Sequence, residues 1–480
     1  MIAAAMLAFA VAALVLTIAP RAFAGRRAAE LGAVASLVAL VELARIPIGK
    51  PGTLWAEIDR PWIGALGAHF HVGVDEISWP FALLTAALTL ACCIWLWQRE
   101  TSPALVALLM VIAGASLGVF VAQDLLLFFI FFEFALVPMW FVIARWGENG
   151  SGGGEARRAA TKFLLYTVIG SSVMFVGFVL VALRGHSLQI DELRGSSSLT
   201  AAILIAVGLA VKVPLVPVHT WLPDAHSKAP TVGSVLLAGI FLKLGTYGLI
   251  RLNVQMLPQP TERIAPWLAG LGVLGIVWAG FACLAQDDLK RLVAYSSVGH
   301  MGFVALAIAT MSQTGIIAAV FGSVAHGLIT GLLFFLAGSL KERYGTASLA
   351  ALGRGLYGRA PWRAVAILAA GLATIGLPGL AGFWGEFLTL RAAFEPASLL
   401  PQTFSIVLMV IATAGIVLAT AYVARFARSL LQGVPTRLDL DRDLWRREAI
   451  VVGGLLLPIL VLGFFPVLIT GLSPAIGYAP

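Results

Sequence analysis

The feature that most constrains this fold is the recurrence of apolar runs along the whole chain of 480 residues. A bilayer core about 30 Å thick requires about 20 apolar helical residues, so each run predicts a membrane-spanning helix. The predicted spans are 2–20, 30–45, 77–97, 103–122, 124–146, 161–183, 200–218, 231–251, 264–285, 290–311, 314–341, 363–392, 404–429 and 448–471. These fourteen segments predict an all-α polytopic membrane protein. The longest gap, about 46–76, is too short for a sizeable soluble domain.

The distribution of basic residues predicts how the chain is oriented. Arg21, Arg26 and Arg27 follow the first apolar run, whereas a signal peptide carries its positive charge before the run. We therefore expect an uncleaved first helix with its N-terminus outside. With this orientation, 22 of the 32 Lys and Arg residues fall in cytoplasmic loops and eight in outer loops. The net charge of +8 then needs no nucleic acid to explain it, and both termini lie outside.

Two predicted helices carry breaks at similar offsets. The seventh contains Lys-Val-Pro-Leu-Val-Pro from residue 212, and the twelfth contains Gly-Leu-Pro-Gly-Leu-Ala-Gly from residue 376. Many transporters consist of two inverted repeats, each with a helix broken at membrane depth. We predict two five-helix repeats, helices 4–8 and helices 9–13, although Pro and Gly are also common in membrane helices generally. The predicted units are 1–102 (helices 1–3), 103–251 (first repeat), 252–430 (second repeat) and 431–480 (helix 14).

Four ionisable residues interrupt the apolar helices, and they point to transport. Glu133, Lys212, Lys243 and Glu386 each lie within a predicted span. A charge at the bilayer centre costs at least ~2.5–3.5 kcal/mol, so such residues are rarely kept without a use. Because they have both signs, they predict a path for an ion. Protons are the first candidate, since Glu and Lys can exchange them.

The sequence also suggests different roles in proton transfer for these ionisable residues. Glu133 and Lys212 can act as a switch, because both keep their charge when close and Lys can release its proton when they separate. The alternative is a static buried salt bridge, although such pairs contribute little to stability. His300 and His326 lie between Lys243 and Glu386 in chain order, and histidine suits a proton relay. A lone histidine can instead be a hydrogen-bonded core residue.

Redox, nucleotide and metal chemistry find little support in this chain. Cys92, Cys93 and Cys283 lie in apolar runs without metal-ligand spacing, and there is no Cys or His cluster for an iron–sulfur centre or haem. There is also no P-loop and no convincing dinucleotide fingerprint. His219, Asp224 and His226 could form a metal site. The favoured interpretation is that their segment is a rigid connector that shapes a cytoplasmic entrance.

Several long motifs resemble the antiporter-like, proton-translocating subunits of respiratory complex I (NADH-quinone oxidoreductase), subunit M in particular. The matching stretches are FFEFALVPMWFVIARWG from Phe131, KVPLVPVHTWLPDAHSKAPTVGSVLLAGIFLKLGTYG from Lys212, DLKRLVAYSSVGHMGF from Asp288, AHGLITGLLFFLAGSL from Ala325 and LPGLAGFWGEFLTL from Leu377. The resemblance implies fourteen helices with two inverted repeats. It also implies roles in proton transfer: Glu133 and Lys212 as the charge pair of the first half-channel, Lys243 as central relay, His300 and His326 as its continuation, and Glu386 at the outer exit.

The same resemblance implies the setting of the chain. It would be a multi-pass protein of the bacterial inner membrane, with both termini on the periplasmic side and other antiporter-like subunits as partners. FMN, iron–sulfur clusters and quinone would belong to partner subunits, with no cofactor or metal in this chain. The alternatives are a subunit of a Mrp-type cation/proton antiporter and a membrane subunit of an ion-pumping hydrogenase. Glu386 argues against the Mrp type, which usually has Lys there. A standalone channel is least favoured.

Overall fold

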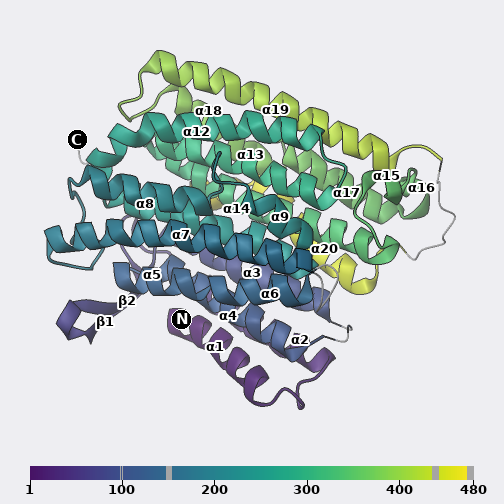
Figure 1. The fold of residues 1–480 in the computed structure, drawn as a ribbon, viewed down its shortest axis with the longest axis horizontal. Coiled ribbons are helices and arrows are strands. Elements are labelled where there is room, and N and C mark those ends of the chain that lie inside the picture. The colour runs from purple at the N-terminus through teal and green to yellow at the C-terminus, as the bar shows by residue number, and fades with distance from the viewer. Residues whose placement is uncertain (98, 100, 148–153, 435–442, 473–480) are drawn as a thin grey trace.

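The computed structural model describes residues 1–97, 99, 101–147, 154–434 and 443–472. Its helices lie side by side, with α1 and α2 along one edge and α19 along the opposite edge (Figure 1). The elements are α1 (Ile2–Ile18), α2 (Arg26–Ala44), β1 (Trp55–Ile63), β2 (Ala68–Val74), α3 (Ser78–Leu96), α4 (Pro103–Val121), α5 (Leu125–Phe134), α6 (Leu136–Trp146), α7 (Gly154–Gly185), α8 (Leu199–Lys212), α9 (Trp221–Lys228), α10 (Thr231–Leu236), η3 (Leu237–Phe241), α11 (Leu242–Gly248), η4 (Leu249–Gln255), α12 (Pro258–Leu284), α13 (Leu289–Ala309), α14 (Gln313–Tyr344), α15 (Leu349–Leu352), α16 (Leu356–Arg359), α17 (Pro361–Thr374), α18 (Ala381–Phe394), α19 (Gln402–Leu431), α20 (Arg446–Phe464) and α21 (Val467–Thr470).

The predicted polytopic helical fold is confirmed. Each of the fourteen predicted ranges contains at least one helix. Among the described residues, ten helical segments are long and apolar enough to cross a membrane, and three shorter apolar helices accompany them. The chain is therefore a multi-pass membrane protein. The count of fourteen spans stays a prediction. The three shorter helices are below the length that a crossing normally needs, and α2, in the predicted span 30–45, belongs to neither group.

Both predicted helix breaks are present. α8 ends at Lys212 and α9 begins only at Trp221, while α17 ends at Thr374 and α18 begins at Ala381. At the first break Pro214 has no backbone N–H to continue the helical hydrogen bonds. At the second, Gly376 adopts φ = +67°, a left-handed conformation that favours glycine. The division of the chain into two repeats stays a prediction.

Three local features differ from the sequence-based expectation. The gap 46–76 holds an antiparallel hairpin of β1 and β2, which projects from one end of the helical array (Figure 1). The alternation of polar and apolar residues in this gap is too short to predict strands from the sequence. The connector 219–226 is helical from Trp221 onwards. The predicted helix 124–146 is divided at Ala135, because Pro138 cannot donate a hydrogen bond to the carbonyl one turn earlier.

The hairpin is fastened to the bundle by His71. Its Nδ1 lies 2.8 Å from Gln189 Oε1 and its Nε2 lies 2.7 Å from Glu57 Oε1. Burial lowers the pKa of His71, but the hydrogen bonds to Gln189 and Glu57 and the negative charges of Asp59 and Glu57 outweigh it, so the net pKa is raised. The hairpin is therefore joined to the segment after α7 through the buried contact between His71 and Gln189, while the contact with Glu57 links the two strands.

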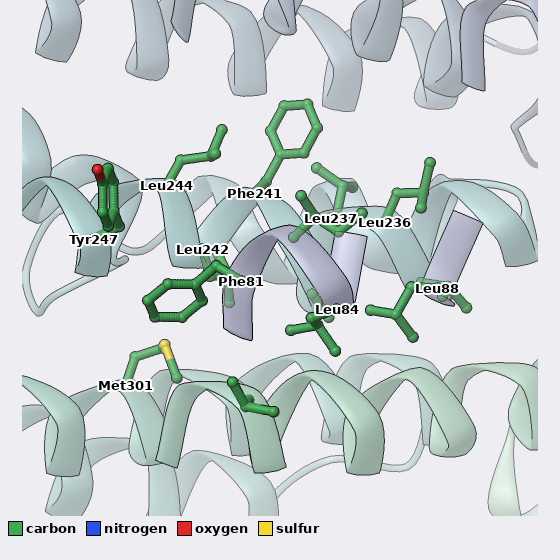
Figure 2. Close-up of a cluster of buried hydrophobic side chains, with 14 of the residues drawn as sticks. Phe81, Leu84, Leu88, Leu236, Leu237, Phe241, Leu242, Leu244, Tyr247 and Met301 are labelled. Atoms are coloured by element: carbon green, nitrogen blue, oxygen red, sulfur yellow. The ribbon is translucent and has the colours of Figure 1, made fainter. Parts of the chain in front are cut away.

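One span is enclosed by protein on all sides. It runs from α10 through η3, α11 and η4, and its apolar window is wholly buried. η3 and η4 are π-helical turns, which are rare and occur frequently at functional sites. Figure 2 shows Phe81, Leu84 and Leu88 of α3 packed beside Leu237 and other apolar side chains of this span. The span carries Lys243 at its centre, which is thereby kept away from lipid.

A buried ion pair anchors the far end of this central span. Arg251 Nη2 lies 2.5 Å from Asp75 Oδ2, and the same guanidinium donates to Tyr247 Oη and Gln255 Oε1. Asp75 in turn accepts hydrogen bonds from Ile77 N and Ser78 N at the start of α3. Removing one partner of such a pair costs about 3–5 kcal/mol, because the other charge is left uncompensated. The pair thus fixes the central span against α3.

Candidate functional site

Lys243 lies at the centre of a buried polar site. Its Nζ donates to the carbonyl of Ala238 at 2.5 Å and lies 2.6 Å from His326 Nδ1. Ala238 belongs to η3, where the π-helical turn is wider than an α-helical turn. A charged lysine has donors only, so His326 Nδ1 must then accept and the imidazole proton lies on Nε2. The side chain is fully buried, and these two contacts take up two of the three donors of its ammonium group.

A close helix crossing brings His326 to Lys243. A Cβ atom on the neighbouring Gly327 would lie 2.7 Å from Leu84 Cδ2 and 3.1 Å from the carbonyl oxygen of Gly239. Only glycine allows α14 to approach η3 this closely, as small residues do at membrane helix interfaces generally. A larger side chain at 327 would separate the two helices and lengthen the contact between Lys243 and His326.

The polar line continues from His326 to Glu386. The rings of His326 and His300 lie 5.7 Å apart, and His300 Nδ1 lies 3.5 Å from Glu386 Oε1. A small cavity of about 30 Å³ is lined by both histidines, Thr330 and Glu386. The structure therefore brings together four of the predicted residues, which come from α11, α14, α13 and α18. Each of the four side chains lies close to the next one in the line, either in direct contact or at a separation that one water molecule can bridge.

The first predicted pair has a different geometry. Lys212, at the end of α8, is buried, with Nζ 4.7 Å from the ring centroid of Phe132 and 4.5 Å from that of Phe241. Glu133 is half-buried, and its polar neighbours are Ser171 and Lys212. Among the described residues the two charges form no ion pair within 4 Å, and neither Lys212 Nζ nor Glu133 Oε1 has a hydrogen-bond partner.

A static salt bridge therefore does not describe this pair. The Lys212 ammonium lies over aromatic faces, which attract a cation through the ring quadrupole. Glu133 is held at the end of α5, where the helix is divided before Pro138. The two groups interact through space without a fixed contact, so the charge of one can change without breaking a hydrogen bond to the other.

The alternative of a metal site at His219, Asp224 and His226 is not supported. Asp224 pairs with Lys162 at 2.6 Å and with Arg291 at 3.4 Å. His226 stacks on the ring of Phe334. In the part of the chain that the structure describes, no group of three His, Cys, Asp or Glu side chains converges as metal ligands would.

Two polar residues near Glu386 were not predicted from the sequence. Ser296 Oγ lies 2.8 Å from Tyr422 Oη, and both line a second cavity that also contacts His300 and Glu386. Ser296 lies among small residues and Tyr422 lies in an apolar helix, and neither belongs to a recognisable sequence motif. Ser296 does lie one helical turn before His300, on the same face, which is the only sequence signal that could have indicated it.

The fold and the buried polar residues together indicate the class of membrane protein to which this chain belongs. A helical membrane protein with two interrupted helices and a buried line of Lys, His and Glu is a polytopic protein of the antiporter-like class. The chain belongs to the NADH:quinone oxidoreductase/Mrp antiporter family, whose transmembrane domain matches residues 122–418. Within that family it is an antiporter-like membrane subunit of the subunit M type, so the sequence-based resemblance is confirmed.

Individual relatives agree with this assignment. NADH-quinone oxidoreductase subunit M of Rhodobacter capsulatus is 37% identical over 93% of this chain and 88% of its own length. NAD(P)H-quinone oxidoreductase chain 4 1 of a Synechococcus strain is 41% identical over 85% of this chain and 78% of its own length. A chain of respiratory complex I from Thermus thermophilus with bound NADH has a TM-score of 0.88 and 27% identity, with 99% of each chain covered.

Proposed function

We propose that this subunit transfers protons through the membrane arm of an NADH-quinone oxidoreductase of the complex I type. The observation that carries the proposal is the buried line Lys243–His326–His300–Glu386, with its 2.6 Å, 5.7 Å and 3.5 Å separations. Every member can gain and lose a proton, and the line lies inside an apolar bundle that keeps bulk water away. Buried ionisable groups of this kind mark proton relays in pumps and transporters.

The geometry supports a stepwise transfer. Lys243 in its charged form passes a proton to His326 Nδ1, becoming neutral, and His326 releases the proton from Nε2 towards His300. In this scheme a water molecule in the adjoining cavity would bridge the two rings. His300 then passes a proton to the Glu386 carboxylate across the 3.5 Å contact. Each step leaves the donor ready to be reprotonated from the Lys243 end.

The pair of Glu133 and Lys212 supplies the control in this scheme. The end of α8 packs on α11, because a Cβ at Gly245, two residues along the helix from Lys243, would lie 3.0 Å from Lys212 Cβ. In this scheme the charge of Lys212 acts on Lys243 across this contact between the two helices. When Lys212 is charged, it opposes a second charge on Lys243 and favours transfer onward; when it is neutral, Lys243 is reloaded. Because no fixed contact holds Lys212, a change at Glu133 is enough to shift its charge.

The subunit would work together with partner subunits in a membrane. Redox energy would come from partner subunits that hold FMN, iron–sulfur clusters and quinone, and neighbouring antiporter-like subunits would continue the path. The two predicted repeats, 103–251 and 252–430, would both contribute residues to it. We place the chain in the bacterial inner membrane with both termini on the periplasmic side, on the strength of its basic-residue distribution.

Purification of the tagged chain in mild detergent tests this proposal directly. We expect a flavin and iron–sulfur spectrum to accompany it, with quinone reduction by NADH. An assembly of small membrane subunits without redox absorbance would instead indicate a Mrp-type antiporter, which the family also contains. A nickel-containing assembly would indicate an ion-pumping hydrogenase. Either of these outcomes would overturn the complex I assignment while leaving the proton path to be tested by mutation.

A further inference from the structure

Glu386 lies between two cavities, and only one of them belongs to the line from Lys243. The second is a cavity of about 20 Å³ formed by α12, α13, α18 and α19. Small residues make the room: Ala279 of α12, Gly299 of α13, and Gly415 and Ala419 of α19 line it. A cavity of this size has enough space for a water molecule. Glu386 and His300 are its polar groups on the side of the proton line.

The opposite side of this cavity is also polar. Ser296 and Tyr422 line it, and their hydroxyl groups are hydrogen-bonded at 2.8 Å. Both side chains are buried. An ordered water needs two to four polar partners, and these two hydroxyls with His300 and Glu386 provide them. The cavity is therefore suited to a hydrogen-bonded water, in contrast to an apolar void that stays dry.

The hydroxyl pair lies on the side of Glu386 that faces the start of α13. Ser296 is one turn before His300, about 6 Å closer to Leu289 along the helix axis. Tyr422 is one turn before Arg425 on α19, and Arg425 pairs with Asp287 at 2.8 Å. Asp287 is largely exposed, so the aqueous surface begins there. Polar groups thus extend from Glu386 towards the expected cytoplasmic face.

We propose that Ser296 and Tyr422 form a side branch of the proton path that joins Glu386 to the end of the bundle marked by Asp287 and Arg425. This inference rests on the proposed function, since it adds a second connection to the same Glu386. A Tyr–Ser pair can rotate its hydroxyls to pass a proton along a hydrogen-bonded chain without either residue becoming charged. Glu386 then exchanges protons both with His300 and with the Ser296–Tyr422 pair, so two proton pathways meet at its carboxylate.

Variants of the intact complex in inverted membrane vesicles test the branch. NADH oxidation and dye-reported acidification together give protons moved per NADH, measured across a series of pH values. We expect Tyr422→Phe to lower coupled turnover about tenfold and to change its pH profile, because a proton-transfer group contributes ~10²–10⁴-fold and water can replace part of it. Ser296→Ala should act in the same direction with a smaller effect.

Two further variants separate transfer from structure. Gly299→Ala keeps both hydroxyls but places a methyl group in the cavity, with its nearest neighbour at 3.5 Å, so it should impair pumping by excluding water. Thr420→Ala is the matched control, because this exposed hydroxyl on α19 bonds only the carbonyl of Ile416 in its own helix. It should leave protons per NADH and the pH profile unchanged.

The outcomes distinguish the branch from the main path. Normal pumping and an unaltered pH profile in both Tyr422→Phe and Gly299→Ala would overturn the branch. If Tyr422→Phe lowers the amount of assembled subunit, Gly299→Ala alone decides, and wild-type behaviour there refutes the proposal. Normal pumping by Glu386→Gln would instead remove the proposed function itself. An inactive Glu386→Gln beside fully active Tyr422→Phe and Gly299→Ala variants would remove the branch alone.

Discussion

The proposed proton path has two parts that hold their charges in different ways. The first half is the pair Glu133 and Lys212, and the second half is the line Lys243, His326, His300 and Glu386. In the first half Lys212 lies over two aromatic rings, and Glu133 makes no direct contact with it. In the second half Lys243 is within 2.6 Å of His326, and two cavities adjoin the histidines and Glu386. The first half can therefore change charge freely, whereas the second half can pass a proton between groups already in reach.

This difference has a physical basis in the neighbouring side chains. Aromatic rings stabilise an ammonium group without accepting a proton from it, so they hold the charge of Lys212 without forming a relay. Histidine accepts the proton itself and can release it from its other nitrogen. In the proposed path, this contrast assigns charge sensing to the first half and proton conduction to the second. Three predictions can break or sharpen this division.

The largest effect is expected from Lys243→Met in the conducting half. The variant keeps the volume of the side chain but removes the group that contacts both Ala238 and His326. Coupled turnover should fall by about 10²-fold or more, because a proton-transfer group is lost and nothing nearby replaces it. The measurement is NADH-driven proton uptake by inverted vesicles, with the assembled complex quantified in the same preparation.

Lys162→Met provides the control for this prediction. Lys162 is a lysine of the same type in a half-exposed surface pair with Asp224, and such pairs contribute about 0–1 kcal/mol. Its turnover should stay close to that of the wild type. If Lys243→Met also pumped normally with the complex intact, Lys243 would not be the centre of the path and the division into two halves would be wrong.

How far the sequence could predict these halves depends on the type of signal. Charged residues within apolar helices identified Glu133, Lys212, Lys243 and Glu386, because burial of a charge is costly enough to stand out from composition alone. The helix breaks were likewise predictable from proline and glycine. Contacts between helices were not: the distance from Lys243 to His326 depends on the close crossing at Gly327, which no local pattern reports.

The same limit explains what the sequence missed. The separation of Lys212 from Glu133 depends on where the Phe132 and Phe241 rings come to lie, and those side chains belong to different helices. The π-helical turns of the central span were also hidden, since no residue type favours them strongly. The hairpin was missed because its two short strands fall in a gap that lacks a long regular alternation. Local chemistry was therefore predictable, and the relative placement of helices was not.

A smaller effect is expected in the sensing half, where it should also be non-additive. Glu133→Gln should lower coupled turnover about tenfold, because Lys212 loses the charge that controls it while the conducting line stays intact. Lys212→Met should act similarly. Since both variants disable one switch, the double variant should be little worse than either single variant, in contrast to two independent sites, whose effects add. Turnover of the four forms in matched vesicles gives the comparison.

Glu155→Gln is the matched control for Glu133→Gln, because Glu155 is an exposed partner of Lys228. It should change turnover very little. Additive losses in the double variant would show that Glu133 and Lys212 act separately. Loss of the subunit from the complex in either single variant would show a structural role for that residue and would weaken the sensing interpretation.

The smallest effect concerns the second helix break, which positions Glu386. Gly376 has φ = +67°, and a Cβ there would lie 2.5 Å from Glu386 Oε2. Gly376→Ala should therefore introduce about 1–2 kcal/mol of backbone strain and displace the carboxylate from His300, lowering coupled turnover a few-fold. Gly453→Ala in α20 is the control, since a Cβ there meets no atom within 4 Å and alanine favours the helix. If Gly376→Ala pumped like the wild type, the contact between His300 and Glu386 would tolerate displacement. Conduction in the second half would then depend on water in the cavities more than on fixed side-chain contacts, and the contrast with the first half would narrow.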